Sequence, residues 1–316
     1  MAIPLVSGKL YNLSMLVLTE EDVLRHLPMA DAVRLVEDTF VRLATGEAVN
    51  QPRRRLMLPT GSVLHQLAGA WGGYFGTKIY STHPKHGAHF HVLLYDAATA
   101  RPLALFDANH LGQIRTGAAS GVATRLMARE DATVLAVIGA GFQAETQLAA
   151  IRAVRPIREA RVWSRNAGRR RAFADRFGAV APETAEEAVR GADIVVTITF
   201  SKDPVVDAAW IAPGCHVNAA GSNNPTRREL PADLLAAAAR IAVDSRDQAR
   251  IESGDLLLGG VDLDSPRVVE LQEIAAGRLP GRTSPGEITV FKSNGLGVQD
   301  VAVAAHIYER VLAERK

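Results

Sequence analysis

The stretch Val134-Leu-Ala-Val-Ile-Gly-Ala-Gly-Phe-Gln-Ala144 decides the fold class, because it reads as a buried strand, a glycine turn and a helix start. Gly139 permits a tight turn, and Gly141 lets the backbone approach a bound group without a Cβ in the way. Ala144 is small enough for the helix and the strand to pack closely. The helix N-terminus offers unpaired N–H groups, so the segment predicts a pyrophosphate-binding site. The strand and helix on either side disfavour the alternative, a turn that binds nothing.

Strands and helices alternate on both sides of this turn. Helices are expected over residues 111–129, 143–154, 167–177 and 184–190, and strands over 133–138, 160–163, 192–199, 216–220 and 241–244. This spacing predicts a parallel sheet covered by helices on both faces, which is an α/β fold with a Rossmann-type doubly wound sheet.

The flanking segments have a different pattern. Residues 19–46 read as two helices that meet at Pro28, and residues 53–106 read as strands separated by Gly and Pro. The second pattern is typical of an antiparallel or mixed sheet. Residues 301–312 form an amphipathic helix that could return to pack on this part of the chain. We therefore expect a smaller α+β domain beside the parallel sheet.

Composition and charge disfavour several classes of function. The 316 residues are 47% apolar and 22% charged, and the net charge of +2 favours neither nucleic acid nor an anionic membrane. No apolar run reaches the roughly 18–20 residues of a membrane span, and no signal-peptide pattern is seen. The single cysteine, Cys215, forms no intramolecular disulfide and is expected to be a buried thiol. We expect a cytoplasmic protein that acts on a small molecule.

The end of the next strand bears on cofactor choice. NAD sites usually place Asp or Glu there to bond the ribose 2′-hydroxyl, whereas this chain has Ser164 and Arg165 at that point. Arg165 can pair with a 2′-phosphate, and Arg169 adds positive charge. NADP(H) is therefore favoured, and NAD(H) is the alternative. The alternative is a solvated basic helix face, which could apply to Arg170 and Arg171.

Several further motifs occur in a fixed order along the chain. They are Gly76-Thr-Lys-Ile-Tyr80, Gln113-Ile-Arg-Thr-Gly-Ala-Ala-Ser120, Gly139-Ala-Gly-Phe-Gln-Ala144, Gly191-Ala-Asp-Ile-Val-Val196, Val217-Asn-Ala-Ala-Gly221 and Phe291-Lys-Ser-Asn-Gly-Leu-Gly-Val-Gln-Asp300. Together they resemble the ornithine cyclodeaminase/μ-crystallin family over nearly the whole chain, most weakly before residue 50. Members of this family include cyclising deaminases, alanine dehydrogenases, and reductases of ketimines or of cyclic imines such as Δ1-pyrroline-2-carboxylate.

The resemblance implies an organisation as well as a chemistry. Residues 1–112 with 298–316 would form a substrate-binding and dimerisation domain, and residues 113–297 a Rossmann dinucleotide-binding domain. A nicotinamide cofactor, a small imino, amino or 2-oxo acid substrate and a homodimer are also implied. The residues expected to contact the cofactor are Thr116, Gly139, Ala140, Gly141, Phe142, Gln143, Ser164, Arg165, Arg169 and Thr199.

By the same resemblance, Lys78 lies near the reacting carbon and Arg115 pairs with the substrate carboxylate. Arg53 is the best match to a second carboxylate-binding arginine, although Arg54 or Arg55 could take that role. An arginine meets a carboxylate with two parallel bonds, and a buried lysine can polarise a C=N or C=O group or move a proton. Taken singly, Lys78 could instead reach solvent and Arg115 could form an interdomain ion pair.

The sequence departs from the family at one position. Cyclodeaminases of this family carry an aspartate shortly after the Asn-Ala-x-Gly strand, and Asn223 stands there in this chain. Asn223 can orient a water or a substrate amine, but a neutral amide cannot act as a base. The departure favours simple hydride chemistry over cyclodeamination, unless Asp244 or Glu229 replaces the missing carboxylate.

Three functions follow, and the first is favoured. It is an NAD(P)H-dependent reductase or dehydrogenase of a small imino or 2-oxo acid. The second is ornithine cyclodeaminase, and the third is a non-catalytic protein that binds NADPH and a small ligand, against which Lys78 and Arg115 count.

Histidines cluster at His83, His86, His89 and His91. Their positions on a loop and a strand suit a metal site poorly. We expect no metal, and a histidine of this group that lines the substrate pocket is the favoured interpretation.

Overall fold

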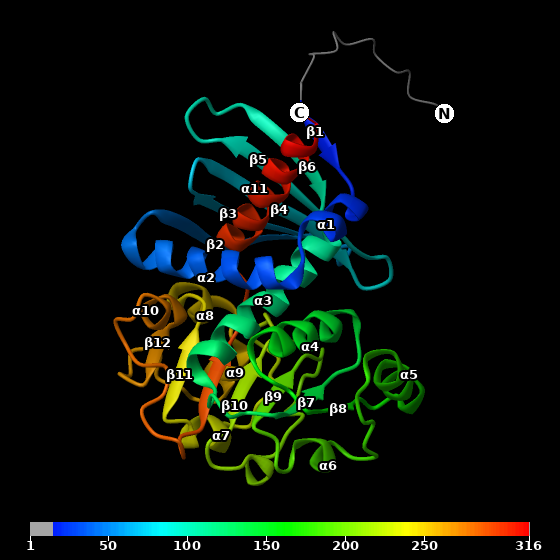
Figure 1. Ribbon diagram of the computed structural model, residues 1–316, viewed down its shortest axis with the longest axis vertical. Coiled ribbons are helices and arrows are strands. Elements are labelled where there is room, and N and C mark those ends of the chain that lie inside the picture. Colours follow the sequence, from blue (N-terminus) through cyan, green and yellow to red (C-terminus); the bar gives the residue numbers. More distant parts are fainter. Residues whose placement is uncertain (1–14, 316) are drawn as a thin grey trace.

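The computed structural model describes residues 15–315, which form two sheets, one above the other in Figure 1. In the upper sheet the order is β1-β6-β5-β4-β3-β2, with β1 parallel to β6 and the other pairs antiparallel. Its strands are β1 (Leu16–Leu18), β2 (Ala48–Met57), β3 (Val63–Trp71), β4 (Tyr74–His83), β5 (Gly87–Asp96) and β6 (Pro102–Asp107).

The lower sheet is parallel throughout the described residues and has the order β12-β11-β13-β10-β9-β7-β8. Its strands are β7 (Val134–Ile138), β8 (Glu159–Trp163), β9 (Ile194–Thr197), β10 (His216–Ala219), β11 (Arg240–Val243), β12 (Val268–Glu270) and β13 (Thr289–Lys292). The chain leaves β7 for β8 on one side and reaches β9 on the other. This reversal is a topological switch point, where ligands bind in such sheets, and the predicted α/β fold is confirmed.

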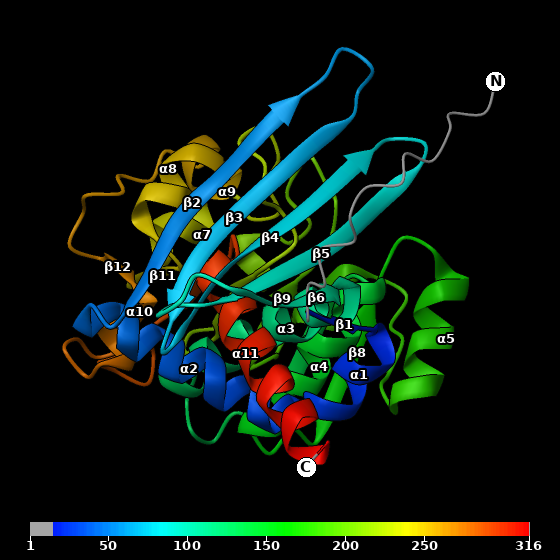
Figure 2. The same ribbon diagram turned by 90° about the horizontal axis from the view of Figure 1, so that it is seen from above.

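Helices cover both sheets. They are α1 (Glu20–His26), α2 (Met29–Thr45), α3 (Asn109–Met127), α4 (Phe142–Val154), α5 (Ala167–Phe177), α6 (Ala185–Val189), η1 (Ala208–Trp210), α7 (Ala232–Ala237), α8 (Arg246–Glu252), α9 (Gly254–Leu258), α10 (Leu271–Ala275) and α11 (Gly297–Glu314). Helix α11 returns from the lower sheet and packs on β3 and β4, as the sequence predicted (Figures 1 and 2).

Helix α3 joins the two sheets and is buried along most of its length. Its small residues allow close packing on α4, since a Cβ at Gly117 would collide with the backbone carbonyl of Thr146. This packing holds the end of α3 that carries Arg115 beside the first turn of α4.

Two strands of the lower sheet were not predicted. Strand β13 lies between β10 and β11, although it has only four residues and ends in Lys292. Lysine is rarely found fully buried, but Lys292 pairs with buried Asp255 at 2.8 Å. The pattern of apolar residues along the sequence does not reveal this charge partner, so a buried strand that ends in lysine was not predicted. Strand β12 has three residues and is too short to show a period.

Candidate active site

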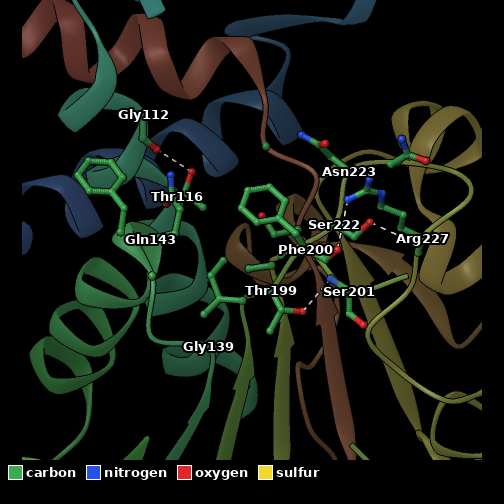
Figure 3. A pocket seen from close by; sticks show the side chains of 18 of the residues that line it. Gly112, Thr116, Gly139, Gln143, Thr199, Phe200, Ser201, Ser222, Asn223 and Arg227 are labelled. Carbon is green, nitrogen blue, oxygen red and sulfur yellow. Dashed lines mark hydrogen bonds between the residues drawn. The ribbon is translucent and has the colours of Figure 1, made fainter. Parts of the chain in front are cut away.

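A cavity of about 1040 Å³ opens between the two sheets, next to the glycine turn (Figure 3). Side chains from β2, β3, β4 and β5 line it on one side, and the loops after β7, β8, β9 and β10 on the other. Every site residue predicted from the sequence lines this cavity: Arg53, Lys78, Arg115, Thr116, Gly139, Ala140, Gly141, Phe142, Gln143, Ser164, Arg165, Arg169, Thr199 and Asn223. Residues far apart in the sequence therefore meet in one place.

The glycine turn forms one end of the cavity, the glycine-turn end. Gly139 has φ +129°, a conformation that L side chains rarely adopt, and an added Cβ would collide with the carbonyl of Ile198. An added Cβ at Gly141 would meet no heavy atom within 4 Å. Gly141 caps α4 without a side-chain hydrogen bond, so no side chain occupies the N–H groups of the first turn, although that of Ala144 donates to the carbonyl of Gly141 at 3.0 Å. The turn fits a bound pyrophosphate.

Two polar side chains support the same interpretation. The buried Oε1 of Gln143 has no hydrogen-bond partner within the described part of the chain, and an orphaned buried acceptor is costly unless a ligand or water meets it. Thr116 donates its hydroxyl proton to the carbonyl of Gly112 at 2.7 Å, which leaves its lone pairs accessible beside Gln143. Both residues come from the region where α3 and α4 approach each other.

The end of β8 carries the residues that bear on cofactor choice. Arg165 and Arg169 are exposed at the rim of the cavity, and Asn166 caps α5 by accepting from the backbone N–H of Arg169 at 2.9 Å. The alternative of a solvated face does not hold for Arg170, because its side chain is buried and pairs with Glu183. Arg171 is exposed.

Lys78 and Arg115 share one buried carboxylate in a second part of the cavity, here called the lysine end. Lys78 Nζ lies 3.2 Å from Oδ1 of Asp300, and Arg115 Nε donates to the same oxygen at 3.0 Å. Oδ2 of Asp300 has no hydrogen-bond partner among the described residues. Gly112 makes room for the lysine, since a Cβ there would collide with Nζ.

Burial, opposed by Asp300 and assisted by the nearby charge of Arg115, lowers the pKa of Lys78 to about 8. The ammonium group therefore loses and regains its proton within the physiological pH range. A lysine with this property in a cavity is suited to proton transfer.

The arginines of β2 have different surroundings, which separates the three alternatives. Arg53 is buried, lines the cavity and pairs with Glu252 at 2.5 Å. Arg54 is exposed and does not line the cavity. Arg55 is half-buried behind the cavity wall, where it also meets Glu252, at 2.5 Å. The geometry thus favours Arg53 as the residue that faces a ligand.

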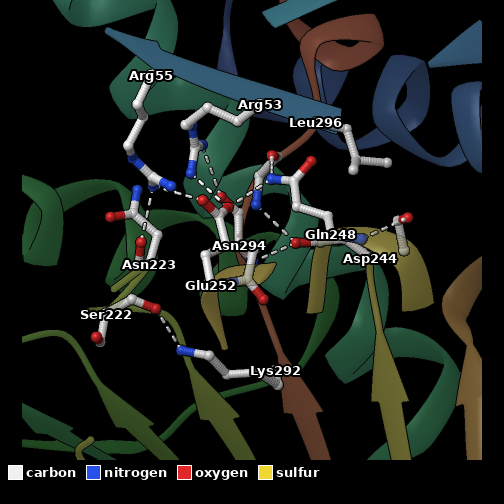
Figure 4. Close-up of polar contacts among 12 residues, drawn as sticks. Arg53, Arg55, Ser222, Asn223, Asp244, Gln248, Glu252, Lys292, Asn294 and Leu296 are labelled. Atoms are coloured by element: carbon white, nitrogen blue, oxygen red, sulfur yellow. Dashed lines mark hydrogen bonds and ion pairs between the residues drawn. The ribbon is translucent and has the colours of Figure 1, made fainter. Parts of the chain in front are cut away.

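Asn223 lies on the loop after β10, and its backbone carbonyl accepts a hydrogen bond from Arg55 at 2.9 Å (Figure 4). Neither carboxylate considered as a substitute base lines the cavity. Glu229 accepts from the backbone and hydroxyl of Thr199, and Asp244 accepts from the backbone of Asn294 and Gly295. Burial raises the pKa of both acids. Both bonds to Asp244 go to Oδ2, and its buried Oδ1 has no hydrogen-bond partner among the described residues, but it does not line the cavity.

The expectation for the clustered histidines was wrong. The cavity is lined by Thr82, Ala88 and Phe90 from the hairpin of β4 and β5, and by His65 from β3. The ring of His65 stacks on Tyr80 with 4.2 Å between centroids. Burial and the charges of Arg55 and Arg53 lower the pKa of His65 to about 4, so it is neutral at pH 7.

The expectation for Cys215 can also be compared with the structure. Cys215 is buried, as predicted, and burial raises its pKa to about 12. Over residues 15–315, no group of three or more His, Cys, Asp or Glu is arranged to hold a metal ion. None of the helices in the same range is long and apolar enough to span a membrane.

Sequence reasoning missed two carboxylates of the site, Asp300 and Glu252. Asp300 is the last residue of the Phe291–Asp300 motif, which could have marked it as a site residue, but the motif does not show that it pairs with Lys78 and Arg115. Glu252 lies outside every motif, 199 residues from Arg53, and only the fold brings the two together.

The glycine turn at a switch point, facing a buried lysine and two arginines across one cavity, defines an NAD(P)-dependent oxidoreductase with a two-sheet architecture. The chain belongs to the ornithine cyclodeaminase/mu-crystallin family, whose profile matches residues 14–315.

Three similar proteins illustrate this membership. A Delta(1)-pyrroline-2-carboxylate reductase of Bacillus cereus is 41% identical over 232 residues, covering 71% of each protein. The structure of the Thermococcus litoralis Delta(1)-pyrroline-2-carboxylate reductase with NADH and L-proline has a TM-score of 0.90 and 32% identity, covering 95% of this chain and 98% of that one. An archaeal alanine dehydrogenase dimer with bound NAD has a TM-score of 0.89 and 34% identity, covering 96% and 97%.

Proposed function

We propose that this protein is an NAD(P)H-dependent reductase or dehydrogenase of a small imino or 2-oxo acid. One observation carries the proposal: Arg53, Lys78 and Arg115 converge in the cavity onto which the glycine turn opens. The relatives named for reduction of Δ1-pyrroline-2-carboxylate and for alanine dehydrogenation support the same reaction class.

The two arginines would hold the substrate carboxylate. Arg53 donates from Nη1 to the carboxylate of Glu252 and from Nη2 to the backbone carbonyl of Asn294. Its buried Nε–H has no partner among the described residues. Arg115 uses Nε on Asp300 and keeps Nη2 available. Each guanidinium is therefore held by protein on one side and presents donors on the other, as an oriented carboxylate site requires.

Lys78 would supply the proton. A dinucleotide held at the glycine turn would supply the hydride for the carbon of the C=N or C=O group, and the nitrogen or oxygen would then need a proton. Protonated Lys78 can donate that proton, and Asp300 favours the protonated form and fixes the position of Nζ. In the oxidative direction neutral Lys78 takes the proton back.

The glycine-turn end would hold the dinucleotide. Backbone N–H groups from Gly141 onward would bind its pyrophosphate, and Gln143 and Thr116 would lie beside it. Exposed Arg165 and Arg169, with no carboxylate among the described cavity-lining residues, favour NADPH over NADH.

The residues that line the cavity also disfavour cyclodeamination of ornithine. An ornithine side chain carries a second ammonium group, and no Asp or Glu of the described chain lines the cavity to pair with it. His65 is neutral there, and Asn223 cannot act as a base. A protein that only binds NADPH and a ligand would have no need for a buried lysine of lowered pKa.

The test follows NADPH oxidation at 340 nm with Δ1-pyrroline-2-carboxylate, or with pyruvate and an amine. Steady oxidation is the expected result. Release of ammonia from ornithine with catalytic amounts of NAD would establish the cyclodeaminase instead. Tight NADPH binding without turnover of any acid would favour the non-catalytic binder.

We propose a homodimer formed through the outer face of the upper sheet. Leu56 and Leu64 are cross-strand partners there, exposed by 60% and 43%, and Ile79 lies on the same face. Exposed apolar patches of this kind mark association surfaces. Leu56→Glu is expected to give monomers in light scattering, and an unchanged mass would show that the dimer uses another face.

We also propose the domain division of residues 1–112 with 298–316 and residues 113–297. The first boundary falls inside α3, which would make this helix the rigid connection between the domains. The cytoplasmic location stays a prediction.

A further inference from the structure

Glu252 is a fully buried carboxylate that the proposed reaction does not use. It is the last residue of α8, beside the lower sheet, whereas its partners Arg53 and Arg55 lie on β2 of the upper sheet (Figure 4). Oε1 accepts from Arg53 and Oε2 from Arg55, each at 2.5 Å. Gln248, one turn earlier on α8, donates to Oε1 at 2.7 Å. One carboxylate thus connects the two sheets through both of its oxygens.

The two arginines extend this connection to two segments of the cavity wall, which follow the neighbouring strands β10 and β13. Arg53 reaches the carbonyl of Asn294, next to the segment that leads into α11, at 2.9 Å. Arg55 reaches the carbonyl of Asn223, on the loop after β10, at 2.9 Å. Figure 4 shows both guanidinium groups converging on Glu252 from one side.

We propose that Glu252 is a positioning residue for the acid substrate, acting through Arg53 directly and through Arg55 on the Asn223 loop. The inference rests on the proposed function, because it assigns Arg53 to the substrate carboxylate. A guanidinium binds a carboxylate in two-bond geometry only when its plane is fixed. Glu252 and Asn294 fix that plane while leaving Nε–H free.

Glu252 could act in the opposite way, as a negative charge that weakens binding of an anionic substrate. The geometry argues against competition of this kind. Glu252 is shared between two arginines and also accepts from Gln248, so its charge is compensated without using the free donor of Arg53. When the charge of Glu252 is removed, the lost orientation of Arg53 should therefore weaken substrate binding more than the lost repulsion strengthens it.

The experiment uses the full-length protein with Glu252→Gln, Arg55→Met, the double variant, and Arg54→Met as the matched control. Arg54 is adjacent on β2 but exposed and outside the cavity. Glu252→Gln is expected to raise KM for the imino acid about 10- to 100-fold while kcat falls less than about threefold. Arg55→Met should raise KM although Arg55 does not line the cavity. The double variant should be no worse than Glu252→Gln.

A second measurement separates this inference from the proposed reaction. Calorimetric titration of NADPH-loaded protein with pyrrole-2-carboxylate, a planar cyclic acid, reports acid binding without turnover. Glu252→Gln should weaken this acid and leave NADPH affinity unchanged. If the wild type binds the acid but turns over no imino or oxo acid, the proposed reaction fails and the binding series still tests Glu252.

Several results would overturn the inference. A purely structural role would lower Tm and the active fraction of Glu252→Gln, with KM and acid affinity unaltered. A competing charge would make Glu252→Gln bind the acid more tightly. Independent, additive effects of Glu252→Gln and Arg55→Met would remove the coupling through the shared carboxylate. A wild type with neither acid binding nor turnover would overturn the inference and the proposed function together.

Discussion

The two ends of the cavity offer different groups to a negatively charged ligand. The glycine-turn end uses backbone N–H groups from a few consecutive residues, with exposed arginines at its rim. The lysine end uses Arg53, Lys78 and Arg115, three buried cations from separate elements, each paired with a buried carboxylate. The shared carboxylates couple the residues that they hold, because residues in one ion-pair network depend on each other. Substitutions at the lysine end should therefore have larger and less additive effects.

The largest effect is expected for Lys78→Ala, which removes the proton donor. Turnover should fall about 10³-fold, a typical contribution of a general acid. NADPH affinity should be nearly unchanged, because the glycine-turn end is intact. Steady-state rates and calorimetry with NADPH measure the two quantities, and unaltered turnover would exclude Lys78 from the mechanism.

Asp300→Asn tests the coupling at the lysine end. Lys78 and Arg115 would lose their shared partner, and kcat should fall about 10²-fold through misplacement of both groups. Imine reduction needs protonated Lys78, so wild-type kcat should decline as pH rises through about 8, and amino-acid oxidation should rise over the same range. Because Asp300 raises the pKa of Lys78, the variant should show this decline at lower pH. A pH–rate profile with an unmoved midpoint would contradict the pairing.

The glycines allow a matched comparison at the other end. A Cβ at Gly141 has open space, so Gly141→Ala should fold normally and weaken NADPH binding about 10-fold by obstructing the pyrophosphate. Gly139→Ala should instead lower Tm, because of its positive φ and the contact with Ile198. Equal losses of Tm in the two variants would show that Gly141 has a structural role only.

The smallest effect is expected for Arg165→Asp. The side chain is exposed, so its ion pair with a 2′-phosphate is screened, and the NADPH/NADH preference should shift about 3- to 10-fold toward NADH. Ratios of kcat/KM for the two cofactors measure the shift. If the ratio does not move, selectivity depends on another residue, and Arg169 is the next to test.

The sequence by itself determined the glycine-turn end, because a strand, a turn and a helix that are contiguous carry their whole signal in one window. It also placed Lys78, Arg115 and Arg53 at the site, through motifs that resemble a family. It named Arg53 as the best match but left Arg54 and Arg55 open, since strand alternation is interrupted by the bulge between Gln51 and Arg54.

Only the tertiary structure decided how the lysine end is held. Asp300 lies 222 residues from Lys78, and Glu252 lies 199 from Arg53. No local preference selects such partners. A buried charge requires an opposite charge within a few ångströms, and which carboxylate supplies it depends on how α8 and α11 pack against the upper sheet.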